Sequence, residues 1–251
     1  MSVKATHFAF AFNFTNLPKG LTRLLMRWAF RNVHRFIVFA NVERSQYAEY
    51  FGIDAGRIDF LPWVMDVPHS SEPAFVDGKY ICAVGGEGRD YDTLVAAVQS
   101  APHVNTVIVT RAYNAPRGPL PQNVSVHTEL RGPDFWNVVK HAHAVVVPLR
   151  DDQTNCGHIT LVGALRLGRP VVASESRGIE DYVTDDINAL IVKPSDPSAL
   201  RNAIEKIWSD SALHGRLRRR ILEAELIKDG CETAWTDYFR RQLAPLLDKV
   251  R

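Results

Sequence analysis

Residues 145–174 decide the fold of this chain, and they read VVVPLRDDQTNCGHITLVGALRLGRPVVAS. The stretch opens with the apolar run Val145–Leu149, which is typical of a buried parallel strand. A helical pattern follows, whose apolar side consists of Leu161, Val162, Leu165 and Leu167. Gly168 stands where a helix C-cap glycine belongs, Pro170 forbids continuation, and Val171–Ala173 returns as a second strand. The stretch therefore predicts a β-strand, α-helix, β-strand unit.

The loop between the first strand and the helix is the first candidate for a binding site. Cys156, Gly157 and His158 lead from a polar loop into the helix. The carboxyl end of a parallel strand and the amino end of a helix together gather unpaired N–H groups and the positive end of the helix dipole. We expect this corner to bind an anion.

Bulk composition excludes several classes of protein. The chain has 251 residues, 46% of them hydrophobic and 23% charged, which is ordinary for a globular protein. A net charge of +2 is too small to predict a nucleic-acid partner. The three cysteines show no metal spacing, and they are typical of reduced intracellular thiols. With no signal peptide and no long apolar run, we expect a cytoplasmic protein whose membrane contact, if it has one, is peripheral.

The first 67 residues alternate strand and helix. The predicted strands are Phe8–Phe12, Phe36–Ala40 and Ile58–Leu61, and the predicted helices are Pro18–Val33 and Val42–Phe51. Three strands are few for an independent doubly wound domain. We therefore interpret residues 1–67 as a partial, truncated Rossmann-like half-domain.

The first of these helices carries a basic stripe. Its members recur every four residues, at Lys19, Arg23, Arg27, Arg31 and Arg35. We expect the stripe to spiral slowly along the helix, opposite Leu24, Leu25 and Phe30. The stripe is either a solvated helix face or a cationic face for anionic lipid headgroups or a charged acceptor. Trp28 near its edge favours the second reading.

A proline-containing linker, residues 68–79, separates this segment from a full α/β domain at residues 80–230. The predicted strands of that domain are Tyr80–Val84, Asn105–Val109, Asn123–His127, Ala144–Leu149, Pro170–Ala173 and Ala189–Val192. Helical patterns between them include Asp90–Val98, Asp134–His141 and Pro197–Ser209. Residues 231–251 form a last helix, and we expect it to pack back on the N-terminal segment.

A second candidate loop follows the first strand of this domain. It reads Gly85-Gly86-Glu87-Gly88-Arg89, in which the glycines allow close backbone approach and Arg89 could clamp a phosphate. Alone, the pattern also fits a plain tight turn. Because this loop and the one at 156–160 both follow strands of one parallel sheet, they should converge. Two anion-binding loops at one crevice predict a nucleoside diphosphate.

Several stretches resemble the retaining GT-B glycosyltransferases of group 1, which are family 4-like. Phe60–Asp66 resembles the strand and "P-N-G-V-D" of that family, and Val84–Leu94 resembles "V-G-R-x-x-x-x-K-G-x-x-x-L". Asn155–Val172 resembles "E-G-F-G-L-P-L-L-E-A-M-A-C-G-x-P-V-V". Gly178–Val192 and Asp196–Leu200 resemble "G-G-x-x-E-x-V-x-D-G-x-N-G-L-L-V" and "D-P-x-A-L". The resemblance covers the chain from about Phe36 onward.

The resemblance implies a Rossmann-like donor domain that holds a nucleoside diphosphate sugar and transfers a hexose with retention. Arg89 takes the place of the phosphate-binding lysine. The implied catalytic residues are Arg89, Asn155 and His158. The implied donor-binding residues are Gly85, Gly86, Arg89, Gly157, His158, Ile159, Thr160 and Gly163. No metal or other cofactor is expected, and the acceptor would be a carbohydrate or a lipid-linked molecule.

Two departures from the family pattern bear on activity. The two glutamates of the family fall here on Asn155 and Gly163, and Gly163 has no side chain to receive the ribose hydroxyls. About half of the N-terminal domain is also missing from the pattern. We therefore expect weak or absent transfer by this chain. Two alternatives stay open: a non-catalytic nucleotide-binding or partner protein, and a sugar-nucleotide epimerase for which His158 would supply the protonatable group.

Overall fold

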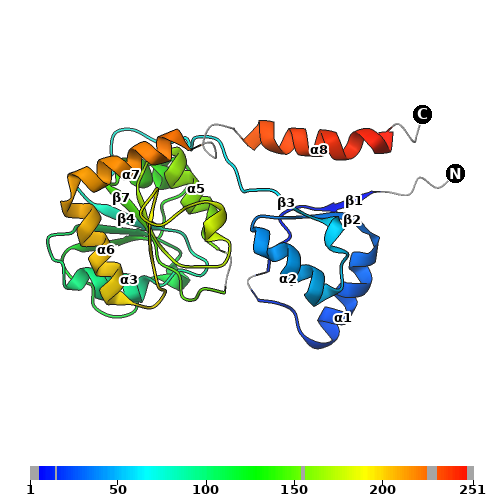
Figure 1. Cartoon of the computed structure of the whole chain (residues 1–251). Coiled ribbons are helices and arrows are strands. Elements are labelled where there is room, and N and C mark those ends of the chain that lie inside the picture. The colour runs from blue at the N-terminus through cyan, green and yellow to red at the C-terminus, as the bar shows by residue number, and fades with distance from the viewer. Residues whose placement is uncertain (1–5, 15, 154–155, 225–230, 248–251) are drawn as a thin grey trace.

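The computed structural model of the chain describes residues 6–14, 16–153, 156–224 and 231–247. Within these residues the chain forms two α/β bodies, each built on a parallel sheet (Figure 1). The smaller sheet has the order β1–β2–β3, with β1 (His7–Ala9), β2 (Val33–Val38) and β3 (Ile58–Phe60). The larger sheet has the order β6–β5–β4–β7–β8–β9, with β4 (Ile81–Val84), β5 (Thr106–Val109), β6 (Val124–His127), β7 (Ala144–Val147), β8 (Val171–Ser174) and β9 (Leu190–Val192).

Helices cover both sheets. The smaller body contains α1 (Gly20–Ala29) and α2 (Asn41–Phe51). The larger body contains α3 (Tyr91–Gln99), α4 (Pro133–His141), α5 (His158–Arg166), α6 (Pro197–Ser209) and α7 (Ser211–Glu223), and the last helix is α8 (Cys231–Leu247). Within the described part of the chain, no helix has both the length and the apolar composition needed to cross a membrane.

The strand order of the larger sheet reverses between β4 and β7. Ile81 of β4 pairs with Thr106 of β5 on one side and with Ala144 of β7 on the other. In open parallel sheets, ligands bind at such a switch point, outside the carboxyl ends of the two strands. The two loops that the sequence singled out both start there, after Val84 and after Val147.

Alternation along the strands divides the interior of the larger body into two layers. Cys82 and Val84 of β4 face α4 and α5, whereas Ile81 and Ala83 face α3 and α6. All four side chains are fully buried. This explains why the strands of this body read as continuous apolar runs rather than as alternating patterns.

Some element boundaries differ from those predicted. The first strand ends at Ala9 rather than at Phe12, and Ala11 has a φ of 55°, which a strand does not tolerate. The first helix ends at Ala29 and tightens into a 3₁₀ turn at Phe30–Asn32, so β2 begins at Val33 rather than at Phe36. The strand β7 stops at Val147 because Pro148 has no N–H to continue the ladder.

The smaller sheet is also covered on both faces. Phe36 and Val38 of β2 face the core shared with α2, whereas Ile37 faces the opposite side. On that opposite side lies α8, across the sheet from α1 and α2 (Figure 1). Its Trp235 ring packs 5.0 Å from the ring of Phe10, and its Tyr238 hydroxyl donates a hydrogen bond of 2.6 Å to Asp59.

Helix α1 turns its leucines outward. Leu24 and Leu25 are 60% and 58% exposed, whereas Phe30 packs on the core of the smaller body. The inward positions are occupied instead by Met26 and by Arg23, whose Nε and Nη2 donate to the Tyr50 carbonyl at 2.9 and 2.7 Å. The basic stripe is therefore partly used to hold α1 on α2.

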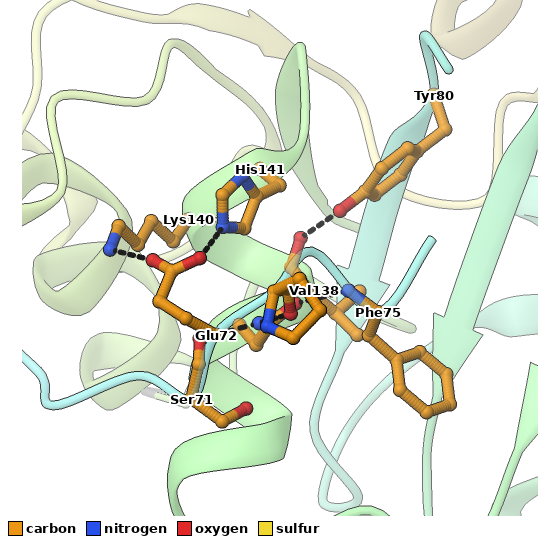
Figure 2. A network of polar contacts seen from close by, with 9 residues as sticks. Ser71, Glu72, Phe75, Tyr80, Val138, Lys140 and His141 are labelled. Atoms are coloured by element: carbon orange, nitrogen blue, oxygen red, sulfur yellow. Dashed lines mark hydrogen bonds and ion pairs between the residues drawn. The ribbon is translucent and has the colours of Figure 1, made fainter. Parts of the chain in front are cut away.

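The linker lies on helix α4, and Figure 2 shows the polar contacts that hold it there. Asn137 accepts a hydrogen bond from Phe75 N at 2.7 Å and donates to Ser71 O at 2.6 Å. Glu72 pairs with Lys140, and its other oxygen lies 3.4 Å from His141 Nε2. The hydrogen bond from Lys140 is the main reason that the pKa of Glu72 is lowered. The linker is thus fastened to the larger body.

Tyr182 joins the two bodies. Its hydroxyl donates to the Phe39 carbonyl at 2.5 Å and accepts from Trp63 N at 2.8 Å. Next to it, Asp181 accepts a hydrogen bond of 2.7 Å from Asn41 N at the start of α2. One short segment of the larger body therefore contacts the smaller sheet at the carboxyl end of β2.

Candidate functional site

The candidate site lies where β4 and β7 end side by side. The loop 85–89 leaves β4 and leads into α3, and the loop after Pro148 leads into α5. The two loops are tied together, since Asp90 N donates to Pro148 O at 3.0 Å and Arg150 N donates to Gly88 O at 3.1 Å. The convergence that the sequence predicted is therefore present in the structure.

Arg89 lies at the centre of this convergence. Its side chain is only 4% exposed. Its Nε donates to Val84 O at 3.3 Å, its Nη1 to Glu87 O at 3.1 Å, and its Nη2 to Thr160 Oγ1 at 3.1 Å. The guanidinium thus connects the end of β4 with the first turn of α5.

The charge of Arg89 is not neutralised by a carboxylate. None of the ion pairs found within the described residues involves it. Its hydrogen bonds go to carbonyl and hydroxyl oxygens and to the Cys156 thiol, none of which carries a negative charge. A buried cation without a counter-charge is costly, and an anion bound beside it would recover part of that cost.

Two glycines make room for this guanidinium. Gly85 has a φ of +121°, and a Cβ there would lie 2.9 Å from Arg89 Nη2. Gly157 has a φ of +95°, and its Cβ would lie 3.1 Å from Val147 Cγ1 and 3.3 Å from Arg89 Nη1. Both positions therefore need glycine for backbone conformation and for close approach.

The amino terminus of α5 lies directly beside Arg89. Gly157 is its N-cap, and no side chain caps the first turn. Thr160 is buried and its hydroxyl also donates to Val84 O at 3.2 Å, whereas Ile159 is 54% exposed. An uncapped first turn leaves backbone N–H groups available to an anion, and the helix dipole adds positive potential.

His158 opens α5 and packs on Tyr182, with ring centroids 4.8 Å apart. Burial, and after it the charge of Arg89, lowers the pKa of His158 to about 4. The imidazole is therefore neutral at pH 7, where one ring nitrogen donates a hydrogen bond and the other accepts one.

Cys156 precedes these residues and has a free thiol. Its Sγ lies 3.5 Å from Glu87 O and 3.7 Å from Arg89 Nη1. Burial raises the pKa of this thiol, although the Arg89 charge opposes the shift. A protonated thiol is a poor nucleophile, so the contacts favour a packing role.

Gly163 is covered by an indole. A Cβ at this position would lie 2.3 Å from Cη2 and 2.4 Å from Cζ3 of Trp136, which belongs to α4. A larger residue at 163 would therefore require Trp136 to move. Asn155, the other position that the resemblance assigns to a glutamate, lies outside the described residues.

A cavity of about 240 Å³ adjoins the Arg89 cluster through Gly85 and Gly86. Its other walls come from the ends of β5 and β6 and the start of α4, and they are Val109, Thr110, Arg111, Leu130, Arg131, Gly132 and Phe135. It is smaller than the roughly 300–1,000 Å³ of a pocket for a drug-sized molecule. Sequence reasoning missed these residues, although Arg111 directly follows a predicted strand and could have been found by that position.

A metal site has no evident ligand set. Within the described residues, no group of three or more histidine, cysteine, aspartate or glutamate side chains is arranged to hold an ion.

Comparison with solved structures identifies the fold. The chain aligns with Anabaena HepE in complex with UDP and glucose at a TM-score of 0.72 and 14% identity, covering 95% of this chain and 71% of that one. It aligns with a glycosyltransferase from Rickettsia africae (TM-score 0.66, 13% identity) over 88% of this chain and 66% of that one. It aligns with sucrose-phosphate synthase from Thermosynechococcus elongatus (TM-score 0.64, 23% identity) over 88% of this chain and 61% of that one.

The chain therefore spans about two thirds or less of the length of the last two proteins, with coverages of 66% and 61%. Identities this low establish the fold alone, which is the α/β, Rossmann-like fold of GT-B glycosyltransferases. No curated protein shows significant sequence similarity to the chain.

Family membership rests on the sequence of the larger body. The family described as Glycosyl transferases group 1 matches residues 84–210, which is half of the chain and includes both loops of the candidate site. This chain belongs to the group 1 glycosyl transferases.

Proposed function

We propose that the chain binds a nucleoside diphosphate sugar at the Arg89 cluster and transfers its hexose with retention of configuration. The observation that carries the proposal is the buried guanidinium of Arg89, which has no carboxylate partner among the described residues and lies against the uncapped start of α5. Membership of the group 1 family supports it. The bound UDP and glucose of HepE belong to that protein, and they suggest the class of donor.

The chemistry proposed for the site is stabilisation of a leaving group. When the bond between the sugar and the diphosphate breaks, negative charge develops on the departing diphosphate. Arg89 and the N–H groups of Gly157, His158, Ile159 and Thr160 would meet that charge with fixed dipoles in a largely buried site. Such groups need no reorganisation during the reaction, which is how fixed donors lower a barrier.

The cavity beside Gly85 and Gly86 is proposed to hold the nucleobase. It lies at the carboxyl ends of β4 and β5, and Phe135 offers an aromatic wall. A planar base fits such a small cavity better than a whole nucleotide sugar. Arg111 and Arg131 add donors for carbonyl oxygens of the base.

The acceptor is proposed to be a carbohydrate or a lipid-linked molecule. We propose a cytoplasmic protein that reaches such an acceptor by peripheral contact of its Lys19–Arg35 segment with a membrane. Nucleic acid has no place in the proposal, because the overall charge is close to balanced.

Calorimetry with UDP, GDP and ADP tests the binding step. Arg89→Gln should weaken the binding of the nucleotide with the highest affinity by roughly 10- to 100-fold, which is the scale of a hydrogen bond to a charged group. Arg169→Gln is the matched control, since Arg169 is a partly buried arginine that donates to the Ala142 and Leu167 carbonyls, before β8 begins. Absence of binding by the unmodified chain, or equal binding by the Arg89 variant, would sink the proposal.

One observation favours a second candidate, a protein that binds the nucleotide without transferring sugar. The resemblance expects a glutamate at position 163, and the structure has the Trp136 indole against that backbone. Incubation with labelled donor separates the two candidates, because only a transferase or a slow hydrolase releases the sugar. The epimerase alternative needs a group that gives or takes a proton at the sugar, and His158, whose pKa burial lowers, is its candidate.

A further inference from the structure

Helix α1 carries an apolar face that nothing in the described chain covers. Leu21, Leu24, Leu25 and Trp28 are 71%, 60%, 58% and 66% exposed. They recur at positions i, i+3, i+4 and i+7, so they form a single stripe along the helix. Singly exposed apolar residues are normal on protein surfaces, whereas four large ones on one helix face mark an interaction site.

The orientation of this face is fixed by contacts on the other side of α1. Met26 and Phe30 pack on the core of the smaller body. Arg23 donates to the Tyr50 carbonyl and stacks over the Tyr50 ring, 4.2 Å from its centroid. Arg27 lies against Gly52, where a Cβ would come within 2.8 Å of its Nη2. Helix α1 cannot bury its leucines without losing these contacts.

The charge around the face is one-sided. Residues 1–42 contain six lysines and arginines and no aspartate or glutamate. The chain has 30 basic and 28 acidic residues in all, which leaves 24 basic and 28 acidic for residues 43–251. Lys19, Arg27 and Arg31 are exposed at the ends and along one edge of the apolar stripe. The positive charge of the molecule is therefore concentrated where the apolar face lies.

We propose that this face of α1 inserts into the surface of an anionic lipid bilayer. Leucine and tryptophan side chains would enter the boundary between headgroups and acyl chains, and the flanking cations would pair with anionic headgroups. Trp28 suits this boundary because its ring is apolar and its N–H can reach water or a headgroup. The apolar residues are the inserting element, and the arginines form the rim.

The proposal rests on the peripheral membrane contact proposed above and names the side chains that make it. It does not depend on sugar transfer, because vesicle binding needs no donor. Charge decides between a bilayer and a protein partner: the centres of protein interfaces are depleted in charged residues, whereas cations flanking an apolar helix face are typical of helices that lie in a membrane surface. A second copy of the chain would bring the same cations together, which repels.

Co-sedimentation with vesicles tests the proposal on the whole chain. The unmodified protein should bind vesicles of phosphatidylcholine and phosphatidylglycerol, and bind vesicles of phosphatidylcholine alone much more weakly. The double variant Leu24→Asp/Leu25→Asp should lower the partition coefficient at least about tenfold, because two carboxylates then face the headgroups. Lys19→Gln/Arg31→Gln, which changes two exposed cations, should reduce the preference for the anionic vesicles.

Leu222→Asp is the matched control, since Leu222 is a 53% exposed leucine on α7 of the other body. It should bind vesicles like the unmodified chain, and melting curves should show all variants folded. Equal binding by the Leu24/Leu25 variant, or no preference for anionic vesicles, would overturn the proposal. The alternative result in light scattering is that the unmodified chain is a dimer and the Leu24/Leu25 variant is a monomer. If neither protein binds vesicles, that result would assign the face to a second copy of the chain.

Discussion

The contact between Gly163 and Trp136 decides what the second turn of α5 can offer a ligand. The resemblance places a carboxylate at this position, but the Trp136 indole fills the space beside the Gly163 backbone. A glutamate introduced at position 163 alone would therefore clash with the Trp136 ring, and its carboxylate could not reach a ligand without movement of that ring. Recovery of a family-like site would need a smaller residue at 136 as well.

The same contact gives a stability prediction. Gly163→Ala should lower the free energy of unfolding by about 1–3 kcal/mol, the usual cost of overpacking. Gly215→Ala is the control, because Gly215 is a helical glycine of α7 with nothing within 4 Å of an added Cβ. That substitution should be neutral or stabilise by up to about 1 kcal/mol. Urea denaturation measures both, and a neutral Gly163→Ala would show that Trp136 moves freely.

His158 predicts a dependence of stability on pH. Its pKa is lowered from 6.5 to about 4, chiefly by burial and secondly by Arg89. Between those two values the unfolded chain binds a proton that the folded chain does not, so the free energy of unfolding falls as pH falls. The slope from this residue is at most about 1.4 kcal/mol per pH unit, and the stabilisation is fully present above about pH 7.

Urea denaturation between about pH 7.5 and about pH 5 would measure the effect, because this range crosses the unfolded-state pKa and enters the interval between the two pKa values. His143 has a pKa lowered to about 4 by burial and contributes in the same direction. The difference between the unmodified chain and His158→Gln therefore isolates His158. Parallel pH profiles for the two proteins would contradict the prediction.

At the scale of elements, the sequence predicted the larger sheet well. Its strands are short runs of β-branched residues buried on both faces, and glycines and prolines bound them, so their positions follow from local composition. The observed strands β4, β5 and β6 begin one residue after the predicted ones and end at the same residue. Their convergence at the site followed from parallel topology alone.

The sequence could not predict which face of α1 packs on the core of the smaller body. An amphipathic pattern gives the two faces of a helix but not which face is covered by the rest of the molecule. Here the core is already filled by the aromatic side chains of Phe12, Phe36 and Phe51, and Arg23 finds the Tyr50 carbonyl. The leucines are left outside. Only the tertiary structure contains this information.

Some residues of the candidate site could be predicted from local sequence patterns, and others could not. Arg89, Gly157 and Thr160 were predicted because each follows a strand or begins a helix. The pairing of Trp136 with Gly163 and of His158 with Tyr182 joins residues far apart in sequence, and no local pattern marks it.

At the scale of the whole molecule, Tyr182 predicts how the two bodies are coupled. Tyr182→Phe leaves Trp63 N–H and the Phe39 carbonyl without this partner, which should cost roughly 1–3 kcal/mol. Hydrogen exchange followed by mass spectrometry should show faster exchange in β2. Tyr80→Phe is the control, because the Tyr80 hydroxyl donates to Val138 O inside the larger body. Unchanged exchange in β2 of the Tyr182 variant would mean that the bodies are coupled elsewhere.

The position of α8 has a consequence for the order in which the molecule is assembled. The strands of the smaller sheet are complete at Phe60, but the helix that covers one of its faces begins only at Cys231. At a synthesis rate of about 5–20 residues per second, that face waits roughly 9–34 s for its cover. During this interval Ile37 and Phe39 of the nascent chain are open to chaperones or to other nascent chains. The smaller body thus leaves the ribosome before the larger one and is completed after it.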